Sequence, residues 1–264
     1  MAGPLTPRPG RGSSADAQGR WWVDVAFTAG LQRRSVVWPA LLGGIVLGHV
    51  GLGLAMLQNG RPWLWALVGN RAPGLLTRWG ALTARSAEEP GRFVSWLFLH
   101  GDGLHLLMNG LALVGLGRLA EALYGPGRLL WLFLLCGVAS GLASWAGGVD
   151  VSVGASGALF GWMGALLSFG VRYRRVLPED LKLLFRRQLL PGVLLNLGIG
   201  MLLPFVDNRA HAGGLVAGVI LGWVLGNRVV PGEESPVWAR ALSGLASAAL
   251  LGLGLLQILS GAAR

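Results

Sequence analysis

The chain has 264 residues, of which 53% are hydrophobic and only 13% carry charge, and its mean hydropathy is +0.58. Soluble domains carry about 25% charged residues, so this composition excludes an ordinary soluble protein and indicates a polytopic membrane protein. The net charge of +10 does not point to a nucleic-acid partner, because the 22 basic residues are scattered through connections between apolar segments.

The N-terminal third of the chain combines a polar tail with a first membrane span. Residues 1–34 are polar and rich in glycine, proline and arginine, which predicts a flexible tail. A span is predicted over 38–57. The connection over 58–99 contains many tryptophans, which favour the boundary between lipid and water. We therefore expect a structured, membrane-embedded segment there rather than a free loop.

Six further apolar segments follow. Segments of about 20 apolar residues can cross a hydrocarbon core of about 30 Å. The remaining spans are predicted over 104–123, 128–146, 156–171, 189–203, 211–230 and 238–260. The expected fold class is an all-α polytopic membrane protein with a six-helix core and one additional C-terminal transmembrane helix. The expected division is a tail over 1–34, the core over 35–230, and a loop with the last span over 231–264.

The distribution of basic residues predicts the orientation of the spans. With the N-terminus inside, 15 of the 22 basic residues fall on inside segments, and so does the dense cluster over 172–187. We therefore expect a cytoplasmic N-terminus, and the spans that begin near Leu104, Ser156 and His211 start on the outer side. A compact chain favours a bacterial inner membrane. An organellar membrane is the alternative, because an arginine-bearing, acid-poor tail resembles a targeting segment.

One serine stands at the start of an otherwise apolar segment, in the sequence GASG over 154–157. A serine hydroxyl is a poor nucleophile until a base takes its proton, so Ser156 needs a histidine within reach. His211, at the start of another apolar span, is the candidate. Small residues follow both: Gly157, Gly161 and Gly164 on one span, and Gly214, Gly218, Gly222 and Gly226 on the other. Such residues let transmembrane helices approach closely, which predicts that packing brings His211 towards Ser156.

Acyl transfer also needs hydrogen-bond donors for a developing oxyanion. His105 and Asn109 are four residues apart, hence on one helical face, and both side chains can donate. The alternative is that they form helix–helix hydrogen bonds that only hold the bundle together. Asp207 precedes His211 by four residues but belongs to a short polar turn. A serine–histidine dyad is therefore expected.

A metal site is not expected. The pattern H-E-x-x-H is absent. His100 and His105 are five residues apart, which would separate them by about 140° around a continuous helix. No cofactor is expected, and the sequence does not indicate an oligomeric state.

Three motifs, in order along the chain, resemble those of the rhomboid intramembrane serine proteases. Residues 100–109 are similar to the family's H-x4-H-x3-N element, 154–157 to its G-x-S-G element, and 210–218 to its A-H-x-x-G-x3-G element. Gly117, Arg118, Leu119 and Glu121 are similar to its signature at the end of the second span. The resemblance implies a rhomboid-like core and a hydrolase that cleaves a peptide bond in or near the transmembrane segment of a membrane-protein substrate, without metal or nucleotide.

The resemblance also implies roles for individual residues. Ser156 would be the nucleophile and His211 the general base, and Asn109 and His105 would help hold the oxyanion. The supporting residues would be His100, which organises a loop, with Gly154, Gly157, Phe160 and Gly214. Phe160 stands where some members carry a tyrosine packed against the base, so ring packing is kept and a hydroxyl contact is lost. The alternative function is a non-catalytic rhomboid-like scaffold that binds client transmembrane helices and leaves Ser156 unreactive.

Overall fold

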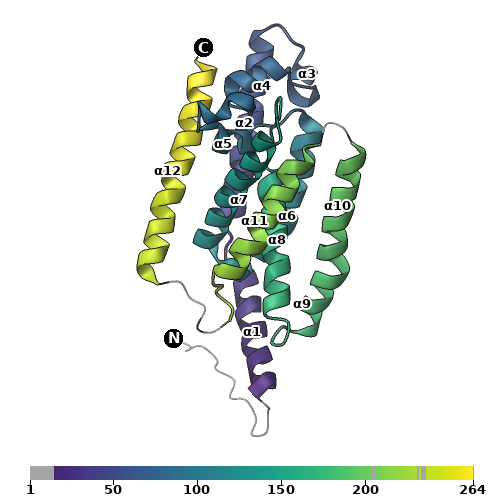
Figure 1. The fold of residues 1–264 in the computed structure, drawn as a ribbon, viewed down its shortest axis with the longest axis vertical. Helices are drawn as coiled ribbons and strands as arrows, with labels where there is room; N and C mark the ends of the chain where they lie inside the picture. Colours follow the sequence, from purple (N-terminus) through teal and green to yellow (C-terminus); the bar gives the residue numbers. More distant parts are fainter. Residues whose placement is uncertain (1–14, 204–205, 231, 233–235, 264) are drawn as a thin grey trace.

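The computed structural model describes residues 15–203, 206–230, 232 and 236–263, and in these ranges the chain is a bundle of helices (Figure 1). The helices are α1 (Ala15–Gln32), α2 (Val37–Gln58), α3 (Trp63–Val68), α4 (Pro73–Trp79), η1 (Ala84–Ala87), α5 (Arg92–Ser95), η2 (Trp96–Phe98), α6 (Gly103–Tyr124), α7 (Pro126–Ala146), α8 (Ser156–Arg172), α9 (Glu179–Leu184), the π-helical η3 (Phe185–Leu189), α10 (Leu190–Leu202), α11 (Asn208–Val224) and α12 (Val237–Ala262). Outside the helices, the described residues form one isolated β-bridge, between Leu82 and Ser152. The predicted all-α fold class is confirmed.

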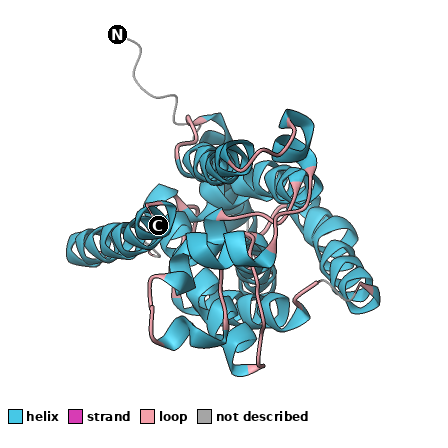
Figure 2. Ribbon diagram, turned by 90° about the horizontal axis from the view of Figure 1, so that it is seen from above, coloured by secondary structure: helices cyan, strands magenta, loops and turns pink. Residues whose placement is uncertain are grey.

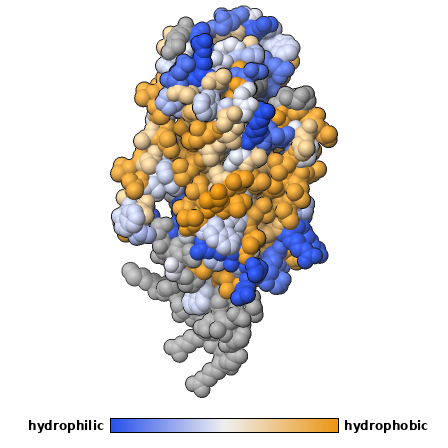
Figure 3. Space-filling model, in the orientation of Figure 1, coloured by the Kyte–Doolittle hydropathy of each residue, from blue (hydrophilic) through white to orange (hydrophobic). Residues whose placement is uncertain are grey.

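The protein is a multi-pass membrane protein. Within the described residues, four helices, α2, α6, α7 and α12, are long and apolar enough to cross a membrane. Hydrophobic residues gather in a broad band around the middle of the molecule and hydrophilic residues at its two ends (Figure 3). This is the surface expected of a bundle whose middle faces hydrocarbon and whose ends face water.

Local signals account for where the helices begin and end. Gly125, with φ +78°, ends α6, and Pro126 occupies the first turn of α7. The last core span differs from its expected range of 211–230, because α11 covers Asn208–Val224. It begins earlier since the Asp207 carboxylate accepts a hydrogen bond from Ala210 N at 3.0 Å. It ends earlier since the backbone at Leu225 is extended, with φ −70° and ψ +130°.

The tail expected over 1–34 differs from the structure in its second half. Residues 1–14 lie outside the described residues, but α1 covers Ala15–Gln32. Val23 and Phe27, four residues apart on one helical face, are buried. At Gly30 a Cβ would lie 2.9 Å from the Ala122 carbonyl oxygen of α6, so α1 packs closely on the core. Composition alone did not reveal this short apolar stripe.

The connection over 58–99 is structured, as predicted, and holds α3, α4, η1, α5 and η2. Two buried arginines organise it. Arg71 donates to the Ala66 carbonyl at 2.8 Å, and Arg92 donates to the carbonyls of Thr77 at 2.6 Å and Ala81 at 2.9 Å. Because a guanidinium carries five donors, one such residue can satisfy several loop carbonyls away from water.

The helices differ in how far they enter the bundle. α8 lies at the centre, with eleven of its 17 residues buried, and α7 and α11 pack against it. α12 stands at one edge in both ribbon views (Figures 1 and 2), and only three of its 26 residues are buried. Ser156 and His211 both lie on central helices of the bundle.

Candidate active site

Ser156 is the first residue of α8, and His211 lies in the first turn of α11. Nε2 of His211 is 2.8 Å from Oγ of Ser156, a hydrogen-bond distance for a hydroxyl and an imidazole. Both residues are half-buried. The structure therefore brings into contact two side chains that are 55 positions apart in the sequence.

Glycines hold the two helices together, as the sequence predicts. A Cβ at Gly214 would collide with the Gly157 carbonyl, and one at Gly218 would collide with the Gly161 carbonyl. At Gly222 a Cβ would lie 2.5 Å from the Cα atom of α8 residue 165. The backbones of α8 and α11 are thus in direct contact over about two turns, which small residues alone permit. Gly226, expected in the same row, lies beyond the end of α11.

The loop before Ser156 is anchored to the long connection. Leu82 and Ser152 exchange two backbone hydrogen bonds, of 3.0 and 2.9 Å, and Gly154 N donates to the Trp96 carbonyl at 2.9 Å. Gly154 has φ +121°, a region that favours glycine. A Cβ there would lie 2.7 Å from Nε2 of His105. Both conformation and space therefore require glycine two residues before the serine.

His105 and Asn109 project from the first turns of α6 towards this loop. Asp102 caps α6 by accepting from His105 N at 2.8 Å. Asn109 is buried, and its Nδ2 would lie 3.8 Å from a Cβ at Gly154. The Asn109 amide donates to the His105 carbonyl at 3.0 Å, a bond within α6 that does not join two helices. The structure thus places both residues beside the loop that carries Ser156.

His100 is fully buried between η2 and α6, outside the membrane-spanning segments. Its ring meets the His105 ring edge-on, with centroids 5.0 Å apart. Burial holds the pKa of His100 well below its ordinary value, and the nearby His105, His49 and Arg71 lower it further. A neutral His100 therefore packs behind His105 and limits where that ring can turn.

The imidazole of His211 is held by a ring rather than by a carboxylate. Phe160 stacks on it with centroids 4.3 Å apart and an interplanar angle of 19°. Within the described part of the chain, Nδ1 of His211 has no hydrogen-bond partner. The Asp207 carboxylate instead caps α11 and accepts from the Ser144 hydroxyl. Ser156 and His211 therefore form a pair, and Asp207 acts on the helix that carries the histidine.

Two serines of α7 hold α11, and neither is among the candidates that the sequence offers. Ser140 is buried and donates to the Ala210 carbonyl at 2.8 Å, directly before His211. Ser144 is buried and donates to Asp207. Polar residues four apart inside an apolar span were the available signal. Among the described residues, no three His, Cys, Asp or Glu side chains are grouped closely enough to hold a metal ion.

The chain is similar to known rhomboid proteins. A family model of the rhomboid domain matches residues 87–228. RHOMBOID-like protein 5 of Arabidopsis thaliana is 39% identical over 166 residues, which are 61% of this chain and 53% of that protein. Rhomboid protease GluP of Bacillus subtilis (strain 168) is 34% identical over 135 residues, 51% of this chain and 26% of that protein. Rhomboid-like protease 5 of Toxoplasma gondii is 34% identical over 155 residues, 57% of this chain and 18% of that protein.

The chain spans about half the length of the Arabidopsis relative and a smaller share of the other two. Some relatives are named proteases and others are named rhomboid-like. The matched residues 87–228 make up more than half of the chain and run from the long connection through α11, so they contain both Ser156 and His211. By this match, the chain belongs to the rhomboid family.

Proposed function

We propose that the chain is an intramembrane serine endopeptidase that uses Ser156 and His211 as a catalytic dyad. The observation that carries the proposal is the 2.8 Å contact between Oγ of Ser156 and Nε2 of His211. A histidine at this distance can accept the hydroxyl proton, which is the requirement for a serine nucleophile. The stack of Phe160 on the imidazole, at 4.3 Å, supports this role because it keeps Nε2 directed at the serine.

The proposed reaction proceeds in two halves. Oγ of Ser156 attacks the peptide carbonyl while Nε2 of His211 takes its proton. The C–N bond then breaks, the proton passes from Nε2 to the leaving amine, and an acyl ester remains on Ser156. Water attacks this ester, His211 takes a proton from the water, and that proton returns to Oγ as the acid product leaves.

Three groups are proposed to stabilise the oxyanion of each tetrahedral intermediate. Ser156 opens α8, so the first N–H groups of this helix have no intrahelical acceptor and its positive dipole end lies at the serine. Asn109 and His105 supply side-chain donors from the neighbouring α6, beside Gly154. The contact between His100 and His105 supports a positioning role for His100.

The proposed substrates are transmembrane segments of other membrane proteins, which reach the site from the bilayer. The exposed apolar surface of α10 supports this: Leu194, Leu195, Met201 and Leu202 are exposed, and only Val193 and Gly200 of α10 are buried. In Figure 1 α10 stands at the edge of the bundle beside α11, so a substrate helix could approach His211 from this side.

The proposed orientation has the N-terminus in the cytoplasm and the dyad opening to the outer side. The dense basic cluster over 172–187 supports it, because basic residues favour the inner side of a membrane. The bacterial inner membrane stays a prediction. The relatives come from plants, a parasite and a bacterium, and one plant relative is named mitochondrial.

The first test is labelling of the purified full chain by a fluorophosphonate probe, together with cleavage of a generic transmembrane substrate. We expect the wild type to label and cleave, and Ser156→Ala and His211→Ala to lose both. Ser168→Ala is the matched control, since Ser168 is a buried serine of the same helix, three turns away, and should keep full activity. A folded wild type that neither labels nor cleaves would contradict the protease and favour the client-binding scaffold.

A further inference from the structure

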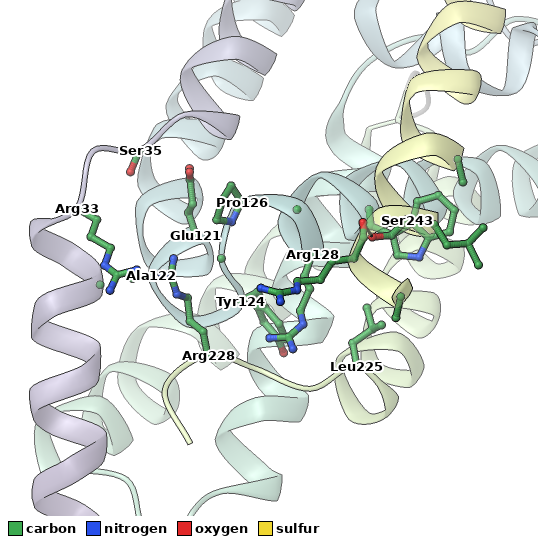
Figure 4. A pocket seen from close by; sticks show the side chains of 18 of the residues that line it. Arg33, Ser35, Glu121, Ala122, Tyr124, Pro126, Arg128, Leu225, Arg228 and Ser243 are labelled. Atoms are coloured by element: carbon green, nitrogen blue, oxygen red, sulfur yellow. Dashed lines mark hydrogen bonds between the residues drawn. The ribbon is translucent and has the colours of Figure 1, made fainter. Parts of the chain in front are cut away.

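A cavity of about 710 Å³ lies at the end of the bundle opposite the dyad. Figure 4 shows the side chains that line it. It is bounded by the α1–α2 connection, the α6–α7 turn, the end of α11 and the start of α12. Neither Ser156 nor His211 lines it. Among the residues that the structure describes, its charged lining is mostly basic and consists of Arg33, Arg34, Arg128, Arg228 and Arg240, with one carboxylate, Glu121.

The Glu121 carboxylate accepts hydrogen bonds from the backbone at the start of α2. Its Oε1 accepts from Val36 N at 2.8 Å and from Val37 N at 3.3 Å, at the start of α2. These are N–H groups that the helix itself leaves without acceptors, and α2 has no cap from its own N-cap side chain. The carboxylate therefore caps α2 and offsets only part of the positive charge around the cavity. Glu233 and Glu234 belong to the part of the chain that the structure does not describe.

Arg228 lies against the α6–α7 turn and within electrostatic reach of Arg33. Its backbone N donates to the Leu123 carbonyl at 2.9 Å, and its Cδ would lie 3.1 Å from a Cβ at Gly125, so it fills the α6–α7 turn. Burial lowers the pKa of Arg228 from its ordinary value, the charge of Arg33 lowers it further, and Glu121 raises it. An anion placed between these guanidinium groups would relieve their mutual repulsion.

The other wall of the cavity is apolar and lies on the outer surface of the bundle. Trp131, Leu225, Trp238 and Leu242 line it, and Trp238 and Leu242 are 70% and 61% exposed. The helix α12 meets the bundle mainly through its second half, where a Cβ at Gly254 would lie 2.8 Å from Cγ1 of the α5 residue at position 94. Its first half borders the cavity, so basic groups and a lipid-exposed apolar face occur together.

We propose that this cavity binds the phosphate-containing headgroup of an anionic phospholipid, whose acyl chains lie along the exposed first half of α12. Arginines form paired hydrogen bonds with phosphate oxygens, and basic pockets between transmembrane helices on the inner side of a membrane recognise anionic headgroups. The apolar wall beside the arginines favours a lipid over free phosphate, because a soluble anion gains nothing from Trp238 and Leu242. The proposal does not depend on proteolysis.

The test is native mass spectrometry of the full chain in detergent, titrated with phosphatidylglycerol or phosphatidylcholine, in parallel with inorganic phosphate. We expect the wild type to retain phosphatidylglycerol in preference to phosphatidylcholine. The variant Arg33→Gln/Arg240→Gln should weaken this preference by about thirtyfold, since it removes two cationic contacts. Both side chains are exposed, so the fold should persist, which the melting temperature checks.

The matched control is Arg174→Gln/Arg175→Gln, which removes the same charge from exposed positions outside the cavity. It should keep the wild-type preference. Equal losses in the two double variants would overturn the proposal, because the binding would then follow total charge rather than the cavity. Displacement of phosphatidylglycerol by millimolar inorganic phosphate would also overturn it, in favour of a free-anion site.

Discussion

α8 and α12 are both apolar helices, yet they relate to the bundle in opposite ways. α8 has 17 residues, eleven of them buried, and its backbone touches that of α11 at the glycine pairs. α12 is longer, at 26 residues, but buries only Ser247, Gly254 and Gly261. Within a bilayer, apolar side chains gain little by leaving lipid for protein. Close approach is decided by small residues and by hydrogen bonds, and the glycine seam therefore holds Ser156 and His211 together while α12 stays at the edge.

The sharpest test of this comparison puts the same substitution in both places. Gly218→Ala would drive a Cβ into the Gly161 carbonyl, whereas Gly252→Ala on α12 meets nothing within 4 Å. We expect Gly218→Ala to lower stability by about 1–3 kcal/mol, the usual effect of overpacking, and to separate Ser156 from His211. Thermal unfolding in detergent and the rate of fluorophosphonate labelling would measure the two effects.

Gly252→Ala is the control, with an unchanged or slightly raised melting temperature because alanine favours the helix. Similar losses in the two variants would mean that the glycine seam is not what distinguishes α8 from α12.

The buried His100 should make the folded protein less stable in acid. Burial lowers the pKa of His100 in the folded protein. Below about pH 6.5 this histidine is therefore protonated in the unfolded chain but stays neutral in the folded one. The unfolded state then binds more protons, and stability falls as the pH falls. The contribution of His100 is complete above about pH 6.5, and each pH unit below it costs up to about 1.4 kcal/mol.

Melting temperatures at about pH 7 and pH 5 test this expectation. His100→Leu should lose less stability over that interval than the wild type does. An equal pH dependence in both proteins would show that His100 does not cause it.

Two substitutions of Asp207 test whether this residue only caps α11 or also acts as a third catalytic residue. Asp207→Ala should cost about 1 kcal/mol, because it removes the acceptor for Ala210 N, and it should slow labelling of Ser156 through the looser start of α11. Asp207→Asn should keep both stability and labelling rate, since asparagine caps helices as well as aspartate does. Loss of labelling in a stable Asp207→Asn protein would instead assign the carboxylate a direct role at His211.

The smallest expected effects lie on α12. Gln257 donates to Glu89 at 2.6 Å and joins α12 to the long connection, so Gln257→Ala should cost about 0.5–1 kcal/mol. Leu245 is 72% exposed, and Leu245→Ala should leave the melting temperature in detergent unchanged. A larger loss of stability in Leu245→Ala than in Gln257→Ala would show that apolar contact, rather than hydrogen bonding, attaches this helix.

The first span could be predicted closely from the sequence, since it was expected over 38–57 and α2 covers Val37–Gln58. The last core span was predicted less closely, because α11 covers Asn208–Val224 instead of 211–230. The pairing of glycines between α8 and α11 was also predictable, because small residues recur on one face of each helix. The helix α1 was not, since a polar composition hid Val23 and Phe27. The roles of Ser140 and Ser144 were likewise out of reach, because their acceptors lie 70 and 63 positions away.

By itself, the sequence determined the membrane class, the apolar segments and the residues available for chemistry, because hydrophobic length and motif spacing are local properties of a chain. Only the tertiary structure decided that Nε2 of His211 lies 2.8 Å from Ser156, that Asp207 caps α11, and that five arginines gather around one cavity beside α12. Each of these depends on the distance between segments far apart in the sequence. Helix packing sets that distance through contacts of backbone and side chains that no single segment contains.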